Sequence, residues 1–134
     1  MIGMVIVTHG NFSEALLKTA EMIIGPQEKV AAVALNASEG LEDLKAKIQV
    51  AVEKVMCDKG VIIFTDMFGG SPSNVSVGFL SDKVEVITGV NLPVLLESAM
   101  LRESAETLHK FAKEMLDKTK KTMVIMSEIH KTCR

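Results

Sequence analysis

The sequence predicts an α/β fold in which helices cover both faces of a doubly wound, mostly parallel sheet. Short apolar runs alternate along the chain with longer segments whose apolar residues recur at helical spacing. This alternation is typical of a parallel sheet, because parallel neighbours are joined by crossover helices. The run at residues 61–65 is almost wholly apolar, as expected for a strand that is covered on both faces.

Strands and helices are expected in strict alternation over most of the chain. The expected strands are residues 2–7, 30–35, 61–65, 84–88 and 123–126, and the expected helices are residues 12–24, 41–56, 72–80, 93–101 and 105–116. The segments 12–24 and 41–56 each carry their apolar side chains on one helical stripe. Gly25 with Pro26 ends the first of these helices, and Gly60 separates the second from the strand that follows.

Size and composition exclude several classes of function. The chain has 134 residues, which fits one domain over residues 1–134 with a real core. A net charge of −2 and an aromatic content of 4% argue against nucleic-acid binding. Cys57 and Cys133 fit no metal or redox spacing, so we expect reduced thiols, no metal and no cofactor. Without a membrane-length apolar run or a signal peptide, we expect a cytoplasmic protein that meets membranes only through partners.

Candidate functional residues gather where the strands end. In open parallel sheets, sites form beyond the carboxyl ends of the strands, where the strand order reverses. The segments at that edge are residues 8–11, 66–74 and 89–93. We expect the first and third strands to be neighbours, which would place His9 and Asp66 opposite each other.

The chemistry of His9 and Asp66 suits nucleophilic transfer. A neutral imidazole is a good nucleophile, and Gly10 leaves space beside His9. A carboxylate that accepts a hydrogen bond from one ring nitrogen fixes the tautomer, frees the other nitrogen and stabilises the imidazolium. Taken singly, a histidine in a loop and an aspartate that caps a turn are the more common explanations of the two residues.

The segment 69–72 reads Gly-Gly-Ser-Pro and is the most specific local signal. Two glycines permit close approach of a ligand, Ser71 stands where an N-cap belongs, and Pro72 stands where the first helical residue belongs. The free N–H groups of such a helix start bind anions, although a capped turn explains the pattern without a ligand. Combined with His9 and Asp66, it predicts transfer of a phosphoryl group to the imidazole and off again. The expected phosphoryl-binding residues are Gly69, Gly70 and Ser71, and the expected cleft-lining residues are Thr8, Gly10, Phe68 and Asn91.

Two other functions fit part of this pattern. A receiver-like domain would be phosphorylated on Asp66, but it needs an acidic pair after the first strand for Mg²⁺, where this chain has Thr8 and His9. A module that binds a small anion or a nucleotide would use the same cleft but leaves His9 without a role. His109 and His130 lack the spacing of metal ligands, and we expect both on the surface.

Three motifs are specific when they are taken together. Residues 7–10 read Val-Thr-His-Gly, residues 64–74 read Phe-Thr-Asp-Met-Phe-Gly-Gly-Ser-Pro-Ser-Asn, and residues 88–93 read Thr-Gly-Val-Asn-Leu-Pro. The sequence resembles the IIA component of mannose-family phosphoenolpyruvate-dependent sugar phosphotransferase systems. The similarity covers most of the chain and fades after about Leu101.

The resemblance implies a phosphocarrier role. His9 would take a phosphoryl group from the histidine phosphocarrier protein HPr and pass it to a IIB component, which phosphorylates the incoming sugar. Asp66 would hydrogen-bond the active histidine, and Ser71 would lie close to the phosphoryl group. The resemblance also implies indirect association with membrane IIC and IID components, and a homodimer in which the strand at 123–126 pairs with the partner's sheet.

Two departures from the family pattern bear on these expectations. Met67 stands where Leu is more usual, which changes little because both side chains are apolar and similar in size. No IIB domain follows in this sequence, so we expect an acceptor in trans, or a role in regulation rather than transport.

Overall fold

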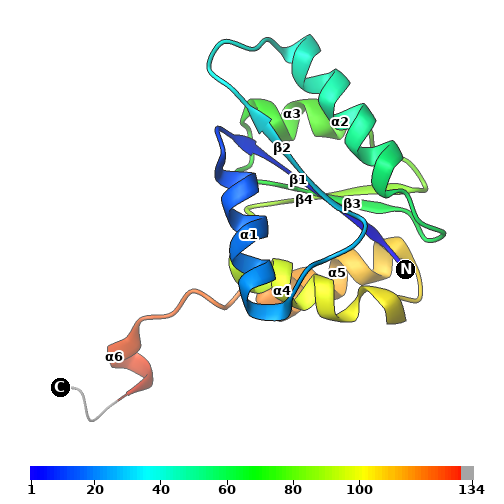
Figure 1. Ribbon diagram of the computed structural model, residues 1–134. Coiled ribbons are helices and arrows are strands. Elements are labelled where there is room, and N and C mark those ends of the chain that lie inside the picture. The colour runs from blue at the N-terminus through cyan, green and yellow to red at the C-terminus, as the bar shows by residue number, and fades with distance from the viewer. Residues whose placement is uncertain (131–134) are drawn as a thin grey trace.

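The computed structural model describes residues 1–130 and contains one sheet of parallel strands in the order β2-β1-β3-β4 (Figure 1). The strands are β1 (Gly3–His9), β2 (Val30–Leu35), β3 (Val61–Thr65) and β4 (Val84–Thr88). The helices are α1 (Phe12–Ile24), α2 (Leu41–Val55), α3 (Ser71–Val77), α4 (Leu92–Leu101), α5 (Leu108–Thr119) and α6 (Met126–Ile129), with a 3-10 turn at Arg102–Ser104. The predicted fold class is confirmed, and β1 pairs with both β2 and β3, so the expected adjacency of the first and third strands is confirmed as well.

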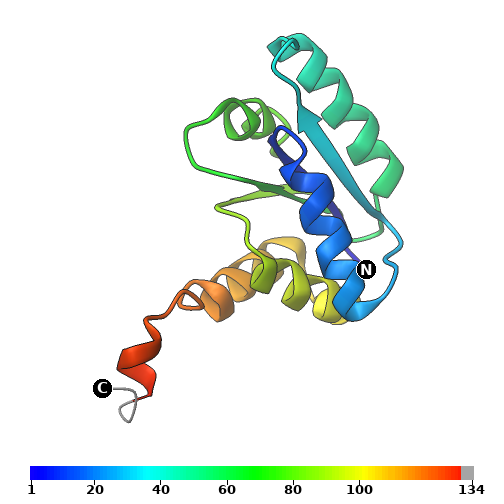
Figure 2. The ribbon, with the colours of Figure 1, turned by 60° about the vertical axis from the view of Figure 1, so that its left-hand side comes forward.

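Helices cover both faces of the sheet (Figures 1 and 2). Met4 and Ile6 of β1 lie in the core that forms against α4 and α5. Val5 and Val7 point the other way, into the core that forms against α2. This alternation has the period of two of a β-strand, and burial on both faces explains why β1 and β3 are continuous apolar runs.

The starts of α3 and α5 differ from the sequence-based expectation. Helix α3 begins at Ser71, and its N-cap is Gly70, so the prediction that Ser71 is the N-cap is wrong by one residue. Helix α5 begins at Leu108 rather than at residue 105, because the Thr107 side chain accepts a hydrogen bond from the backbone N–H of Lys110 and caps the helix there. Apolar spacing alone does not reveal which residue supplies a cap.

The predicted strand at 123–126 is not formed. Residues 123–125 have no regular secondary structure, and Met126–Ile129 forms α6. The segment leaves the end of α5 and extends away from the rest of the molecule (Figures 1 and 2). A strand forms only where it pairs with a neighbouring backbone, and within residues 1–130 this segment pairs with neither of the edge strands, β2 and β4. Pairing with the sheet of a second copy stays a prediction.

No helix in the described part of the chain has the length and apolar character needed to cross a membrane.

Candidate functional site

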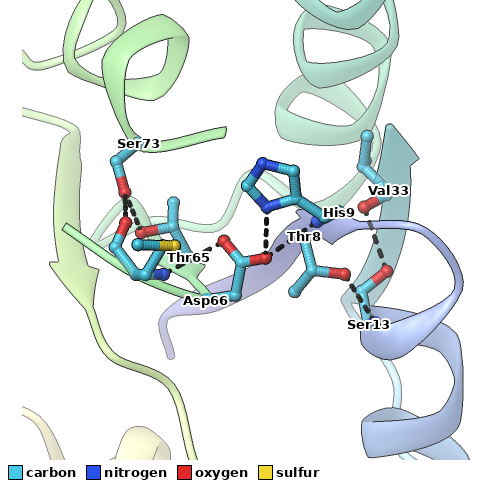
Figure 3. Close-up of polar contacts among 8 residues, drawn as sticks. Thr8, His9, Ser13, Val33, Thr65, Asp66 and Ser73 are labelled. Carbon is cyan, nitrogen blue, oxygen red and sulfur yellow. Dashed lines mark hydrogen bonds and ion pairs between the residues drawn. The ribbon is translucent and has the colours of Figure 1, made fainter. Parts of the chain in front are cut away.

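His9 and Asp66 meet at the carboxyl edge of the sheet. His9 is the last residue of β1, and Asp66 directly follows β3, the strand paired with β1. Nδ1 of the His9 imidazole lies 2.7 Å from Oδ2 of Asp66 (Figure 3). The parallel pairing of two strands that are distant in sequence therefore creates the contact between the nucleophile candidate and the carboxylate.

Both oxygens of the Asp66 carboxylate accept hydrogen bonds. Oδ2 also accepts the backbone N–H of His9 at 2.9 Å, and Oδ1 accepts the backbone N–H of Met67 at 3.0 Å. Burial raises the pKa of the Asp66 carboxyl, but hydrogen bonds from the backbone and ring of His9 outweigh burial and hold this pKa below its ordinary value. Asp66 is therefore an ionised acceptor at neutral pH, so Nδ1 of His9 carries the proton in their shared hydrogen bond.

This arrangement weighs against the receiver-like alternative. An aspartate that accepts a phosphoryl group needs a free carboxylate oxygen, whereas both oxygens of Asp66 are engaged by His9 and Met67.

The second ring nitrogen of His9, Nε2, points away from Asp66 (Figure 3). The His9 side chain is 51% exposed, so this nitrogen can be reached from solvent. The ring lies close to the main chain of Gly70, where an added Cβ would come within 2.9 Å of Cε1 and 3.6 Å of Nε2. Glycine at position 70 therefore lets the loop approach the edge of the ring that carries Nε2.

The loop between β3 and α3 lies against this edge of His9. Gly69 has φ +88°, a backbone conformation that favours glycine. Asn74 ties the loop to α3, since its backbone N–H donates to the carbonyl of Gly70 at 2.9 Å and its Nδ2 donates to the carbonyl of Gly69 at 3.3 Å. Ser71 is half-buried at the start of α3, and no side chain caps the first turn. The leading N–H groups of α3 are thus not occupied by a side-chain cap.

Thr8 lies in the interior rather than in the cleft, which corrects the expectation that it lines the site. It is 0% exposed, and its Oγ1 accepts the backbone N–H of Ser13 at 2.7 Å. The Ser13 hydroxyl in turn donates to the carbonyl of Val33 at 3.0 Å (Figure 3). The N-cap residue Asn11 makes no side-chain hydrogen bond to α1. Thr8 instead accepts a backbone N–H from the first turn of α1, which fixes where this helix starts relative to His9.

The other expected cleft residues, and Met67 beside them, lie at the surface. Gly10 follows His9 and is exposed. Phe68 and Met67 are 85% and 55% exposed, which is unusual for such large apolar side chains. Asn91 is exposed too, but its Oδ1 accepts the backbone N–H of Val94 at 2.9 Å, so it serves as the N-cap of α4.

Sequence reasoning missed two buried hydroxyl groups behind the loop. The hydroxyls of Thr65 and Ser73 lie 2.6 Å apart, and Ser73 also donates to the carbonyl oxygen of Met67. Both residues lie inside the motif at residues 64–74, but the motif does not show that their hydroxyls form a pair, since serine and threonine serve many structural purposes near turns and helix starts.

The other two histidines and Cys57 lie apart from this site. The ring of His109 is exposed and pairs with Glu85 at 2.9 Å, and His130 is exposed. The thiol of Cys57 donates to a backbone carbonyl at 3.3 Å, whereas Cys133 lies outside the described residues. Within residues 1–130, no group of three or more His, Cys, Asp or Glu side chains is arranged to hold a metal ion.

Comparison with known proteins gives consistent results. The sequence model of the EIIA-man family, described as "PTS system fructose IIA component", matches residues 3–125, which extends beyond Leu101, where the resemblance was expected to fade. The chain is 43% identical over 104 residues to the mannose-specific EIIAB component of the phosphotransferase system of Escherichia coli K12, an alignment that covers 76% of this chain and 32% of the relative. The chain thus spans about a third of the length of that protein. It is 34% identical to the fructose-specific EIIA component of Bacillus subtilis, over 90% of this chain and 80% of the relative.

Solved structures of phosphotransferase-system EIIA and IIA proteins have the same fold as this chain. Phosphotransferase system component EIIA from Streptococcus agalactiae superposes with a TM-score of 0.86 at 31% identity, covering 96% of this chain and 99% of the other. A IIA protein associated with the fucose utilization operon of Streptococcus pneumoniae superposes with a TM-score of 0.81 at 27% identity, covering 94% and 93%. By fold and by sequence, the chain belongs to the mannose- and fructose-type EIIA family of the sugar phosphotransferase system.

Proposed function

We propose that this chain is a phosphocarrier of a sugar phosphotransferase system, which accepts a phosphoryl group on His9 from phospho-HPr and passes it to a IIB component. The observation that carries the proposal is the 2.7 Å contact between Nδ1 of His9 and the ionised Asp66, which leaves Nε2 exposed beside Gly70. The family of the chain supports the same role.

In the proposed step, the lone pair of Nε2 attacks the phosphorus of the phosphohistidine on HPr. A P–N bond forms at Nε2 of His9 while the P–N bond of the donor breaks, and its electron pair stays on the donor nitrogen. No proton has to move, because Nδ1 of His9 keeps its proton throughout. The Asp66 carboxylate balances the positive charge that develops on the ring, which makes positioning and electrostatics the main contributions to the rate.

The loop between β3 and α3 is the proposed binding site of the phosphoryl oxygens. Gly70 lies beside the edge of the ring that carries Nε2, and Gly69 and Ser71 are its neighbours along the chain. The start of α3 has no side-chain cap, and the N–H groups of Ser71 and Ser73 would be offered to an anion there. The close approach of Gly70 to the ring gives this assignment a basis that is independent of the helix start.

The proposed partners dock at the same edge of the molecule. The exposed side chains of Met67 and Phe68 would form part of the surface that meets the donor and the acceptor. Indirect association with membrane IIC and IID components would follow through the acceptor. Exposed apolar side chains on residues 123–129 support the proposed homodimer, because such a segment is stabilised by a partner surface.

Intact-mass measurement after incubation with phospho-HPr tests the proposal. We expect one added phosphoryl group in the wild-type protein and none in His9→Ala. The linkage should be lost in acid and survive base, as a phosphohistidine does. If phosphate is absent, or if it is lost in base and depends on Asp66, the carrier function is refuted and an anion-binding or receiver-like function gains support.

A further inference from the structure

Two buried hydroxyl groups stand directly behind the loop that carries Asp66. Thr65 is 0% exposed and Ser73 is 3% exposed, and their oxygens lie 2.6 Å apart. The Ser73 oxygen also contacts the carbonyl oxygen of Met67 (Figure 3). Thr65 is the residue before Asp66, and Met67 is the residue after it. Ser73 therefore contacts both neighbours of Asp66 in the chain.

Counting protons fixes the direction of the chain of hydrogen bonds. A carbonyl oxygen has no proton to give, so the single hydroxyl proton of Ser73 points to Met67. Ser73 must then accept from Thr65, whose hydroxyl proton points to Ser73. The order is Thr65 to Ser73 to the Met67 carbonyl. Since both hydroxyls are buried, water cannot readily take the place of either one.

The main chain of Met67 connects the Ser73 hydrogen bond to the Asp66 carboxylate, and through it to His9. Its carbonyl is held by Ser73, and its N–H donates to Oδ1 of Asp66 at 3.0 Å. The other carboxylate oxygen of Asp66 holds Nδ1 of His9 at 2.7 Å. Ser73 is therefore linked to the reacting ring through Met67 and Asp66, although it does not touch that ring itself.

We propose that Ser73, oriented by Thr65, is a positioning residue that holds the Asp66 carboxylate on Nδ1 of His9 and so keeps Nε2 unprotonated for the phosphoryl group. This inference rests on the proposed function, because it assigns Ser73 a part in that reaction. When the link is cut, the loop gains freedom and the Asp66 carboxylate loses its fixed place. The His9 ring then shifts toward the Nε2–H tautomer that free histidine favours, which cannot attack through Nε2.

Helix α3 offers a matched control. Ser76 lies in the same helix and is 0% exposed, like the nearly buried Ser73, but its hydroxyl has no hydrogen-bond partner among the described residues. Ser76→Ala thus removes the same hydroxyl from the same helix without touching the loop. A second pair of variants, Thr65→Val and Thr65→Ser, changes Thr65 with and without loss of the hydroxyl.

The test combines NMR of isotope-labelled imidazole nitrogens with the kinetics of labelling by phospho-HPr. The NMR signals report the His9 tautomer in the unphosphorylated protein, and His9→Ala assigns them among the 3 histidines. For Ser73→Ala we expect a shift toward the Nε2–H tautomer and a fall in kcat of about fivefold, the size expected for one lost hydrogen bond. KM for phospho-HPr should not change, since Ser73 is buried and out of reach of the donor. Thr65→Val should change both readouts in the same direction by less, because Ser73 can still hold Met67, and Thr65→Ser should match the wild type.

The proposal is overturned if folded Ser73→Ala keeps the wild-type tautomer, or if Ser76→Ala changes the tautomer and kcat as much. If Ser73→Ala does not fold, the His9 tautomer and kcat of Thr65→Val are compared with those of Thr65→Ser. Equal values in the two variants then overturn the proposal. The tautomer readout does not depend on phosphotransfer. An unlabelled wild-type protein would refute the proposed function, whereas an unchanged tautomer in the variants would refute the role of Ser73.

Discussion

A methyl group at position 70 tests the placement of the His9 ring. In Gly70→Ala, the new Cβ would lie 2.9 Å from Cε1 of His9, whereas a relaxed carbon–carbon contact needs about 3.5–4.0 Å. The ring would have to retreat by about 0.6–1.1 Å, which disturbs the 2.7 Å hydrogen bond to Asp66. Misplacement of a reacting group by about 1 Å costs up to about 10²-fold in rate. We therefore expect labelling by phospho-HPr to slow by about 10- to 100-fold.

The fold should tolerate this change. Gly70 has φ −84° and ψ 169°, an extended conformation that alanine adopts readily. The free energy of unfolding should therefore change by no more than about 1 kcal/mol. Slower transfer with unchanged stability is the result expected when the added methyl group displaces the ring and leaves the fold intact.

Gly25→Ala is the matched control, because it should behave in the opposite way. Gly25 ends α1, away from the loop between β3 and α3. A Cβ there meets no atom within 4 Å, but the backbone has φ +86°, which strains any residue other than glycine. We expect a loss of about 1–2 kcal/mol in urea unfolding, with the labelling rate of the folded protein kept within about threefold. If Gly70→Ala is labelled at the wild-type rate, or if Gly25→Ala slows labelling equally, the placement of the ring against the loop is wrong.

Further predictions concern pH and stability. Hydrogen bonds outweigh burial and lower the pKa of Asp66 in the folded state. The ionised Asp66 carboxylate therefore adds to the free energy of unfolding above its unfolded pKa of about 3.9, and this stabilisation is lost as pH falls through the folded pKa. The stability difference between the wild type and Asp66→Asn should thus be full at neutral pH and shrink below about pH 4 in urea unfolding, and a difference independent of pH would contradict this. Arg102 is 4% exposed, and within residues 1–130 its guanidinium donates only to carbonyl oxygens of the main and side chains, so Arg102→Met should cost about 2–4 kcal/mol while labelling of His9 in the folded protein stays unchanged. In Gly3→Ala a Cβ would lie 2.0 Å from the carbonyl oxygen of Val55, and thermal unfolding should reveal a loss of at least about 2 kcal/mol.

The sequence alone predicted much of the fold and the centre of the site. The strands at 30–35, 61–65 and 84–88 were predicted with the bounds that the structure has, because short apolar runs between helical segments are visible in local composition. The pairing of His9 with Asp66 was predicted as well, since the carboxyl ends of parallel neighbours must share one edge of the sheet.

The tertiary structure decided which polar groups serve the site and which serve the fold. Thr8 has the same kind of place in the sequence as His9, yet packing buries it and directs its hydroxyl to the start of α1. Ser73 lies in the motif at residues 64–74, but the sequence does not reveal its link to Met67, because that contact arises only when α3 packs at the end of β3.

The segment at 123–126 has the composition of a strand, but a strand forms only against the backbone of another strand, and the chain's own sheet supplies none at that place. Local composition thus determined what each segment can become and where along the chain the reacting groups lie. Distance and direction between groups far apart in sequence set the hydrogen-bond partners, and these were decided by packing alone.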